Sequence, residues 1–478
     1  MSTANTKKYS FCRRLNEILP KVFFSGIFLL PLTTFAGDLK IGAASVKITP
    51  PVGIPMAGYY FERGAEKIHD DLYAKALVLE KDDSKVAIVT CDLIGIPIEI
   101  VSEARALAAK STGIDADHVM ISATHAHTGP VIPKKDGRDN PTGKSAEILS
   151  AYISKLPGLI AESIKQANDA LQPAKISFGL GHEESISFNR RFFMTDGTVG
   201  WNPGKLNPKI IKPAGPIDPD VSVLYAETND GKPISTYVNF ALHLDNTGGV
   251  EISADIPYTL SDILGKIKGQ EMVTLFGQGC SGNINHINVK SKERQSSLAE
   301  AQRLGAVLSG EVIKTYTRMQ PCDINNISVR RKTVNLPLAE ISPDDLPEAL
   351  KIVAKYGKPN AAPFLDFVNS FKIIEVYNRH GKPIEAEIQV FALGDNLAIV
   401  SLPGEIFTEL GTYIRSRSPF PNTIVVELTN GSIGYVPDRK AFVEGNYEPV
   451  SSRCAPGSGE ILVENALKML NELNSKDL

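Results

Sequence analysis

Apolar runs that fit β-strands alternate with amphipathic runs that fit helices along almost the whole chain. Strand-like runs cover residues 39–50, 72–81, 86–93, 118–124, 174–180, 221–227, 235–241 and 385–401. Runs with helical periodicity cover residues 98–112, 144–170, 256–268, 297–317 and 460–473, the second of them broken at Pro157. Short turns join these runs, and this order predicts an α/β fold of layered mixed β-sheets flanked by helices. No repeat or linker divides the pattern, so we expect one large domain over residues 37–478.

The first 36 residues have the layout of a secretory signal peptide. A basic start precedes an apolar run from Val22 to Leu32, and small residues precede the predicted cleavage site after Ala36. Pro31 interrupts the apolar run, which is too short to span a membrane comfortably. The sequence therefore predicts a secreted or periplasmic protein with no stable membrane span after cleavage. An uncleaved segment would instead associate the protein with a membrane.

The composition indicates which kinds of partner and cross-link to expect. The formal net charge is -3 and no block of lysine or arginine stands out, so we do not expect nucleic acid as a partner. The cysteines that follow the predicted cleavage site are Cys91, Cys280, Cys322 and Cys454. Their wide, irregular spacing is not a zinc pattern. In an oxidising compartment one or two disulfides could form, and the sequence does not choose the pairing.

Two of the eight histidines lie one residue apart in "SATHAHTGP". The apolar run before them predicts a strand that ends at Thr124 and places His125 and His127 at its C-terminal end. A second apolar strand, "TYVNFA", is followed by His243 and then by Asp245. Two strands that each end on a histidine suit a metal site with three histidines, or with two histidines and a carboxylate. The alternative is that these histidines are structural groups, hydrogen-bonded at strand ends.

Three further segments contain candidate site residues. In "LAIVSLPGEIFTELG", a buried strand and a Pro-Gly turn place Glu405 at a predicted helix start, where it could also be an ordinary capping residue. The loop "LTNGSIGYVPDRKAFVEGNYEP" contains Tyr435 and Tyr447. A loop tyrosine beside a metal can bind it or steady an oxyanion, although many loop tyrosines do neither. Residues 194–220, rich in Gly, Pro and Asn, predict an ordered loop that covers a site.

Taken together, these segments resemble the neutral, or alkaline non-lysosomal, ceramidase family. "THAHTGP" is similar to the family's "THTHSGP"-like motif, and "FALH" is similar to its later strand end that carries a histidine. Further segments that look like family segments are "KIHDDLYAKALVLE", "SFNRRFF", "SADIPYTL", "LPGEIFTELG" and "GSIGYVPDRKAFVEGNYE". The resemblance covers roughly residues 40 to 465, in the expected order. It implies that residues 37–478 form a catalytic domain.

The resemblance also implies roles for individual residues. In the family a single zinc ion is held by two histidines, a glutamate and a tyrosine. Carried onto this chain, the ligands are His125, His243, Glu405 and Tyr435. His127 would lie beside the metal and assist the reaction. Arg190 would contact a substrate oxyanion or carboxylate, and the same role is open to Tyr447.

Two departures mark the chain as a divergent member. The family's catalytic segment has a serine followed by proline, whereas "GQGCSGNINHIN" has Asn285 and His286 at these places. Ser281 lies four positions earlier and is no simple substitute. Typical family members also continue into a C-terminal immunoglobulin-like domain, which we expect to be absent because this chain ends after the helix of residues 460–473.

Three hypotheses for function follow. The first is a secreted zinc-dependent hydrolase in which zinc-activated water attacks an N-acyl (amide) bond and His127 or His286 acts as general acid. The second is a metal-assisted carbohydrate enzyme, hydrolase or lyase, whose Arg190, Arg191 and Asp245 bind an acidic glycan. The third is a non-catalytic scaffold. The walls of the site discriminate the first two, since an apolar tunnel favours lipid amides and a wide basic cleft favours glycans.

Overall fold

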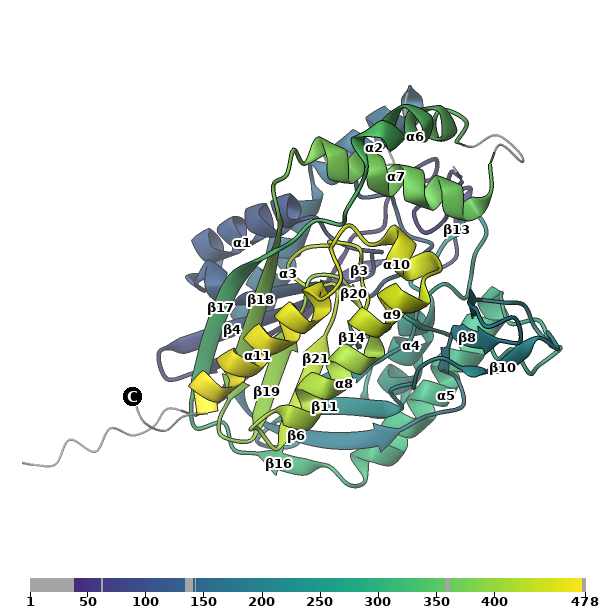
Figure 1. Ribbon diagram of the computed structural model, residues 1–478. Coiled ribbons are helices and arrows are strands. Elements are labelled where there is room, and N and C mark those ends of the chain that lie inside the picture. The colour runs from purple at the N-terminus through teal and green to yellow at the C-terminus, as the bar shows by residue number, and fades with distance from the viewer. Residues whose placement is uncertain (1–37, 62, 134–140, 142, 357–361, 475–478) are drawn as a thin grey trace, which may run out of the picture. The chain divides into compact units, whose positions relative to one another are not determined.

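Two β-sheets packed face to face form the centre of the protein in the computed structural model, which describes residues 38–61, 63–133, 141, 143–356 and 362–474 (Figure 1). The larger sheet has the strand order β14-β12-β11-β6-β1-β3-β4-β5, and β16 pairs with β6. Its strands are β1 Lys40–Lys47, β3 Tyr73–Lys81, β4 Ser84–Cys91, β5 Val119–Ala123, β6 Gln172–His182, β11 Asp220–Thr228, β12 Pro233–Phe240, β14 Val273–Gln278 and β16 Gln320–Cys322. The pairs β4–β5 and β12–β14 are parallel and the other pairs are antiparallel, so the sheet is mixed.

The smaller sheet has four strands in the order β17-β18-β19-β21. They are β17 Ile327–Leu336, β18 Ile384–Leu393, β19 Leu397–Ser401 and β21 Asn422–Val426. Leu77 of the large sheet and Phe391 of the small sheet belong to one shared apolar core. Val78, the next residue on β3, belongs to a different core on the outer face. Because strands buried on both faces need apolar residues at every position, these strands read as continuous apolar runs in the sequence.

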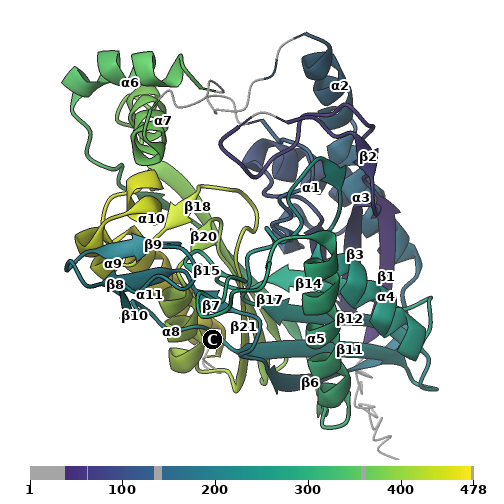
Figure 2. The ribbon, with the colours of Figure 1, turned by 90° about the vertical axis from the view of Figure 1, so that its right-hand side faces the viewer.

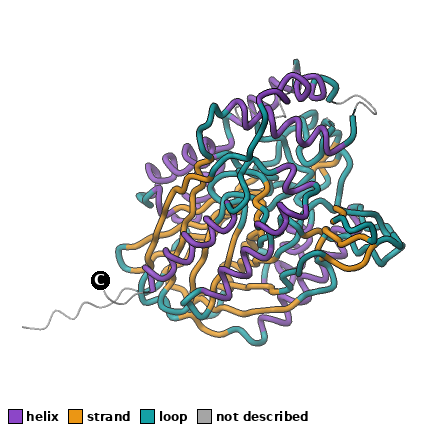
Figure 3. The backbone as a smooth tube through the Cα atoms, viewed as in Figure 1, coloured by secondary structure: helices purple, strands orange, loops and turns teal. Residues whose placement is uncertain are grey.

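Helices cover the outer faces of both sheets, which gives a helix–sheet–sheet–helix arrangement (Figures 2 and 3). The outer face of the large sheet packs against α1 Ile98–Thr112, α3 Leu156–Asp169, α4 Ile256–Lys268 and α5 Leu298–Tyr316. The outer face of the small sheet packs against α8 Thr408–Arg417 and α11 Ser458–Asn474. Ser297 is the N-cap of α5, because its hydroxyl accepts a hydrogen bond from the backbone N–H of Glu300 at 3.1 Å. The predicted layered α/β fold is confirmed.

Short elements join the layers and surround the ends of the strands. The small strands are β2 Lys67–Ile68, β7 Phe188–Asn189, β8 Arg191–Met194, β9 Val199–Trp201, β10 Ile210–Pro213, β13 Glu251–Ile252, β15 Ile284–Asn285, β20 Glu405–Ile406 and β22 Tyr435–Val436. The remaining helices are α2 Lys144–Ile153, α6 Leu346–Val353, α7 Phe364–Asn378, α9 Arg439–Glu444 and α10 Tyr447–Ser451, with 3-10 turns at Ala116–His118 and Pro343–Asp345. Figure 2 shows α6 and α7 beyond α10 at one end of the sheets.

The structure corrects two predictions of local structure, at residues 194–220 and at Glu405. The strands predicted within residues 385–401 form the hairpin β18–β19, turned at Gly394. Residues 194–220 are not a plain loop, because β8, β9 and β10 form a small three-stranded sheet there. Glu405 does not start a helix but lies on β20, three residues before α8. No disulfide joins the described cysteines, which are free.

The predicted signal peptide lies outside the described residues. From Gly37 to Leu478 the chain groups into one compact unit, whose assignment as a single catalytic domain stays a prediction. Among the described helices, none has both the length and the apolar character to cross a membrane.

Candidate metal centre

The centre is built where three strands of the two sheets end. His125 and His127 follow β5, His243 follows β12, and Glu405 follows β19 on the short strand β20. The backbone N–H of His127 donates to the Leu244 carbonyl at 3.1 Å and so joins the two loops that carry the histidines. His125 has a φ of 70°, a left-handed conformation that non-glycine residues seldom adopt and that recurs at functional sites.

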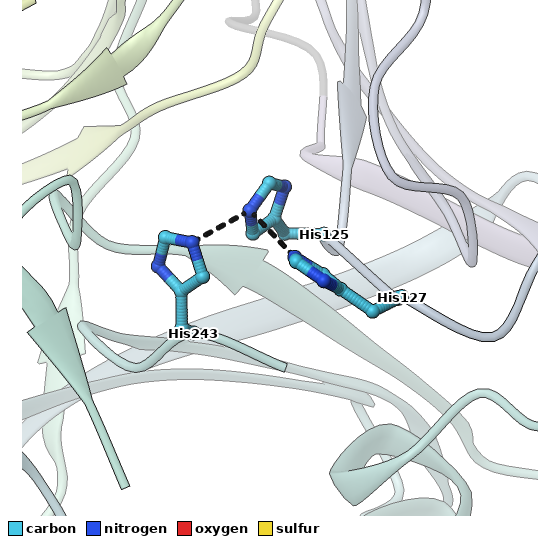
Figure 4. A group of neighbouring side chains, drawn as sticks. All are labelled: His125, His127 and His243. Carbon is cyan, nitrogen blue, oxygen red and sulfur yellow. Dashed lines mark hydrogen bonds between the residues drawn. The ribbon is translucent and has the colours of Figure 1, made fainter. Parts of the chain in front are cut away.

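The three imidazole rings meet at the centre of this region (Figure 4). The Nε2 atom of His125 lies 3.0 Å from Nε2 of His243 and 3.2 Å from Nε2 of His127. On the opposite sides of the rings, Nδ1 of His125 lies 2.8 Å from the Ile94 carbonyl, and Nδ1 of His243 lies 3.1 Å from the Ser281 carbonyl. A carbonyl only accepts, so each Nδ1 carries the proton of its ring. The Nε2 atoms of His125 and His243 therefore face one another as lone pairs.

Such a contact between two lone pairs requires a cation, and the donor atoms fit one. Two ligands of a tetrahedral zinc at about 2.0–2.1 Å stand about 3.3 Å apart. Oε2 of Glu405 lies 3.5 Å from Nε2 of both His125 and His243, and it is buried without a hydrogen-bond donor. The hydroxyl of Tyr435 hydrogen-bonds to Glu405, and the two residues are register partners in the parallel pair β20–β22.

His127 differs from the other two histidines. Its Nε2 lies 3.2 Å from Nε2 of His125, so by spacing alone His127 could also be a metal ligand. However, its Nδ1 is buried and has no hydrogen-bond partner among the described residues, so no carbonyl fixes its tautomer. Gly58 covers the ring, because a Cβ at that position would lie 2.8 Å from Nδ1. His127 is therefore held by packing, and its protonation is not fixed.

The pKa values favour neutral imidazoles and an ionised carboxylate. Burial, followed by the charge of His243, lowers the pKa of His125 to about 4. Burial and His125 hold the pKa of His127 well below its ordinary value. Burial acts against ionisation of Glu405, but His125, His243 and Tyr435 outweigh it and hold the pKa of Glu405 well below its usual range. Neutral imidazoles with an ionised carboxylate are the forms that bind metals.

Glu427 supports two parts of the centre, and the sequence interpretation missed it. Its Oε1 accepts a hydrogen bond from the Ser281 hydroxyl at 2.7 Å, and the Ser281 carbonyl orients His243. Its Oε2 accepts from the backbone N–H of Ile406 at 2.6 Å, next to Glu405. The only sequence signal is a glutamate directly after the apolar run of β21, a place where a buried carboxylate needs a partner.

Arg190 lies behind Tyr435 and is engaged with the protein. Its Nε donates to Glu448 at 2.9 Å and its Nη2 donates to the Gly282 carbonyl at 2.6 Å. The guanidinium also hydrogen-bonds to the Tyr435 hydroxyl, and its carbon lies 5.4 Å from the centre of that ring. These contacts suit a residue that positions Tyr435, while the predicted contact with substrate stays a prediction. Arg191 is likewise buried and paired with Glu448, at 2.8 Å.

The segment that departs from the family pattern is buried and hydrogen-bonded. Asn285 donates from Nδ2 to Oδ1 of Asn202 at 2.9 Å and accepts from the backbone N–H of Ile287. No hydrogen bond among the described residues joins Asn285 to the histidines. Nδ1 of His286 lies 3.0 Å from Oδ1 of Asp245, and although burial opposes it, the Asp245 carboxylate raises the pKa of His286. The predicted roles of these residues in catalysis and substrate binding stay predictions.

A cavity of about 190 Å³ opens beside the centre. His125, His127, Glu405, Tyr435 and Tyr447 are among the groups that line it. The rest of its wall includes apolar and aromatic side chains, among them Tyr60, Val131, Ile132 and Phe371. Trp201 of β9, in the predicted cover segment, is not among the lining residues but packs on Tyr447, with ring centres 4.4 Å apart, and stacks on Phe364 at 5.6 Å. The cavity is thus partly aromatic, and neither Arg190 nor Arg191 is among its lining residues.

Three imidazoles and a carboxylate thus meet between the ends of two packed sheets. Fold and site together define the class, an α/β protein with a candidate metal centre. Residues 39–246 match the family model of the N-terminal part of neutral/alkaline non-lysosomal ceramidases. This match confirms the resemblance that the motifs predict.

Individual relatives agree with that match. The neutral ceramidase of Pseudomonas aeruginosa is 27% identical over 229 residues, which are 45% of this chain and 32% of that protein. The crystal structure of neutral ceramidase from Pseudomonas aeruginosa aligns with a TM-score of 0.70 at 19% identity, over 91% of this chain and 75% of that chain. A structure of a ceramidase complexed with C2 aligns with a TM-score of 0.70 at 18% identity, over 92% of this chain and 76% of that chain. The chain therefore has the fold of these structures.

Proposed function

We propose that the protein is a zinc-dependent hydrolase that cleaves an N-acyl (amide) bond. The observation that carries this proposal is the pair of unprotonated Nε2 atoms of His125 and His243, 3.0 Å apart and each 3.5 Å from Oε2 of Glu405. His125, His243, Glu405 and Tyr435 would hold the metal. A set of imidazole, carboxylate and phenol ligands suits zinc better than calcium or magnesium, which prefer oxygen ligands alone.

Similarity to relatives supports an amide bond as the bond that the protein cleaves. Residues 39–246 match the family model of neutral/alkaline non-lysosomal ceramidases, and the aligned relative is a neutral ceramidase. Zinc, when bound, supplies Lewis acidity that polarises a carbonyl and lowers the pKa of water to about 7. The reaction therefore does not depend on a serine at the position of Asn285.

His127 is the residue that we assign to proton transfer. Burial and His125 keep its pKa well below the ordinary value, so the ring is neutral and can accept a proton. The ring lines the cavity and no carbonyl fixes its tautomer, so His127 would take a proton from water and then give it to the leaving nitrogen. Tyr447, on the cavity wall, would contact the carbonyl oxygen of the substrate.

The location also remains a proposal. The basic, apolar and small-residue order of the first 36 residues supports export to the periplasm or the outside of the cell.

Hydrolysis of a mixed substrate panel tests the proposal. Short- and long-chain N-acyl sphingosines, N-acyl sugars and uronic-acid oligosaccharides are incubated with the protein, with a chelator, and with the chelator followed by excess zinc. We expect amide cleavage that the chelator abolishes and zinc restores. Cleavage that persists in the chelator contradicts the metal, and turnover of the oligosaccharides alone contradicts the amide.

A further inference from the structure

A second hollow of about 480 Å³ adjoins the cavity beside the candidate metal centre. Pro97, Glu375, Ser432 and Arg453 line both hollows. Glu375 of α7 and Arg453, which follows α10, form a two-bond ion pair at this junction, with distances of 2.6 and 2.7 Å. We call the second hollow the groove, and these four residues lie between it and the cavity.

Size indicates that a substrate of the cavity extends into the groove. The cavity measures about 190 Å³, whereas sites for small molecules usually measure about 300–1,000 Å³. An amide held against the metal centre therefore fits with only a short part of its molecule inside the cavity. The rest must leave the cavity, and the groove is a hollow that shares the cavity wall.

The groove differs from the cavity in chemistry. Its charged lining residues are Glu99, Arg331, Glu375, Arg379, Glu385, Glu387 and Arg453. Four carboxylates and three guanidinium groups thus line the groove beside the apolar side chains of Ile98, Ile384 and Ile433, without the aromatic wall of the cavity. The charged part of this lining suits a polar group.

The pairing of these charges shows which of them are available. Arg453 is taken up by Glu375, and Nε of Arg331 pairs with Glu387 at 2.7 Å. Arg379 donates to two carbonyls, including that of Pro383 at 2.8 Å. The charges of Arg453 and Arg331 are therefore balanced by carboxylates, whereas Arg379 is hydrogen-bonded to carbonyls alone.

Two carboxylates of the groove have no such partner. Among the described residues, the side chains of Glu99 and Glu385 have no ion pair or hydrogen bond, and both are exposed. Free acceptors with a negative charge bind ammonium and hydroxyl groups and repel carboxylate, phosphate and sulfonate groups.

From these observations we infer that the groove is a head-group subsite for the N-acyl substrate. The amide lies in the cavity, and a head group that carries ammonium or hydroxyl donors lies in the groove against Glu99 and Glu385. The Glu375–Arg453 pair lies between the two. The inference rests on the proposed amide hydrolysis, and it adds that the substrate has a donor-rich, non-acidic head.

Three amides that share a hexanoyl chain test the inference. Their amine portions end in an ammonium, a hydroxyl or a sulfonate group, and kcat/KM is measured for each with the full protein. We expect the ammonium and hydroxyl amides to exceed the sulfonate amide by about five- to tenfold or more, the effect of one charge pair near the protein surface. The Glu385→Lys variant should lower the ratio of ammonium to sulfonate turnover by at least the same factor.

A matched control is Glu184→Lys, a charge reversal of an exposed glutamate that lines neither hollow. It should keep the wild-type ratio, and thermal unfolding should show that both variants are folded. Equal kcat/KM for the three amides, or a ratio that Glu385→Lys leaves unchanged, overturns the subsite while amide hydrolysis stands.

Binding supplies a readout that does not depend on turnover. The same three head groups are joined to non-cleavable hexyl sulfonamides, and their affinities are measured by calorimetry. If no amide is cleaved but the ammonium compound binds about fivefold or more tightly than the sulfonate compound, the proposed function fails and the subsite stands. Equal affinities for the three compounds overturn the subsite.

Discussion

Glu427 and Ser281 lie 146 residues apart in the sequence, and their side chains are joined by a buried hydrogen bond of 2.7 Å. Ser281 orients His243 through its carbonyl, and the second oxygen of Glu427 holds the backbone beside Glu405. One carboxylate thus fixes two segments that carry candidate metal ligands. Partners of this kind set the orientation of the ligands and are worth about 10–100-fold in metal affinity.

Replacing Glu427 by glutamine should therefore weaken zinc binding by about 10–100-fold. The amide nitrogen of glutamine must face either the backbone N–H of Ile406, where no bond can form, or the Ser281 hydroxyl, which must then turn its own proton away from residue 427. Competition with a coloured chelator measures the affinity. Glu311→Gln is the matched control, because Glu311 is a buried glutamate that hydrogen-bonds to the backbone of His182 and is not part of the centre. If the Glu427→Gln variant binds zinc with wild-type affinity, Glu427 does not support the metal centre.

His127→Ala should retain zinc and lose activity. We assign His127 to proton transfer, which contributes about a hundredfold to ten-thousandfold to a rate. Zinc per chain is measured by atomic spectroscopy, and kcat is measured on the best amide of the panel. If zinc is lost together with activity, His127 is a ligand, as its 3.2 Å distance to Nε2 of His125 also permits.

Gly58→Ala should displace the His127 ring without removing a ligand. A Cβ at residue 58 would meet three atoms of His127 at 2.7–2.8 Å, and the backbone φ of 103° adds strain. We expect kcat to fall by about tenfold or more with zinc content unchanged. Gly143→Ala shares the positive φ but has open space around the added carbon, so it should keep wild-type kcat. Equal rates in wild type and Gly58→Ala would show that the position of His127 is unimportant.

The long alternation of strands and helices was sufficient to predict the layered fold. Each buried strand is apolar on both faces, as with Leu77 and Val78, and such runs are visible without knowledge of their partners. Strands within residues 385–401 were also predicted, but the apolar residues on both sides of Gly394 leave the position of the turn unmarked in the sequence.

Local sequence was less informative about the centre. Histidines at strand ends predicted the convergence of His125 and His243, but the partner of Glu405 depends on a two-residue strand, β22, which is too short to have a pattern. The partners of Arg190 and Glu427 come from distant segments, so no spacing in the sequence could indicate them.

Glu387→Ala should destabilise the fold without a direct effect on the centre. Glu387 of β18 accepts two hydrogen bonds from Arg105 of α1, at 2.8 and 3.1 Å, and both side chains are buried. Removing the carboxylate leaves a buried guanidinium, which costs about 3–5 kcal/mol. Chemical unfolding in the presence of chelator measures the loss. A change below about 1 kcal/mol would mean that water or other groups replace the pair.

The most direct test of the central claim is anomalous scattering at the zinc edge from crystals of the protein purified without added metal. We expect one zinc peak, bonded to Nε2 of His125 and Nε2 of His243 at about 2.0–2.1 Å. Crystals of His243→Ala should lack the peak. A zinc peak elsewhere, or the same peak in His243→Ala, would contradict the assignment of this cluster as the metal centre.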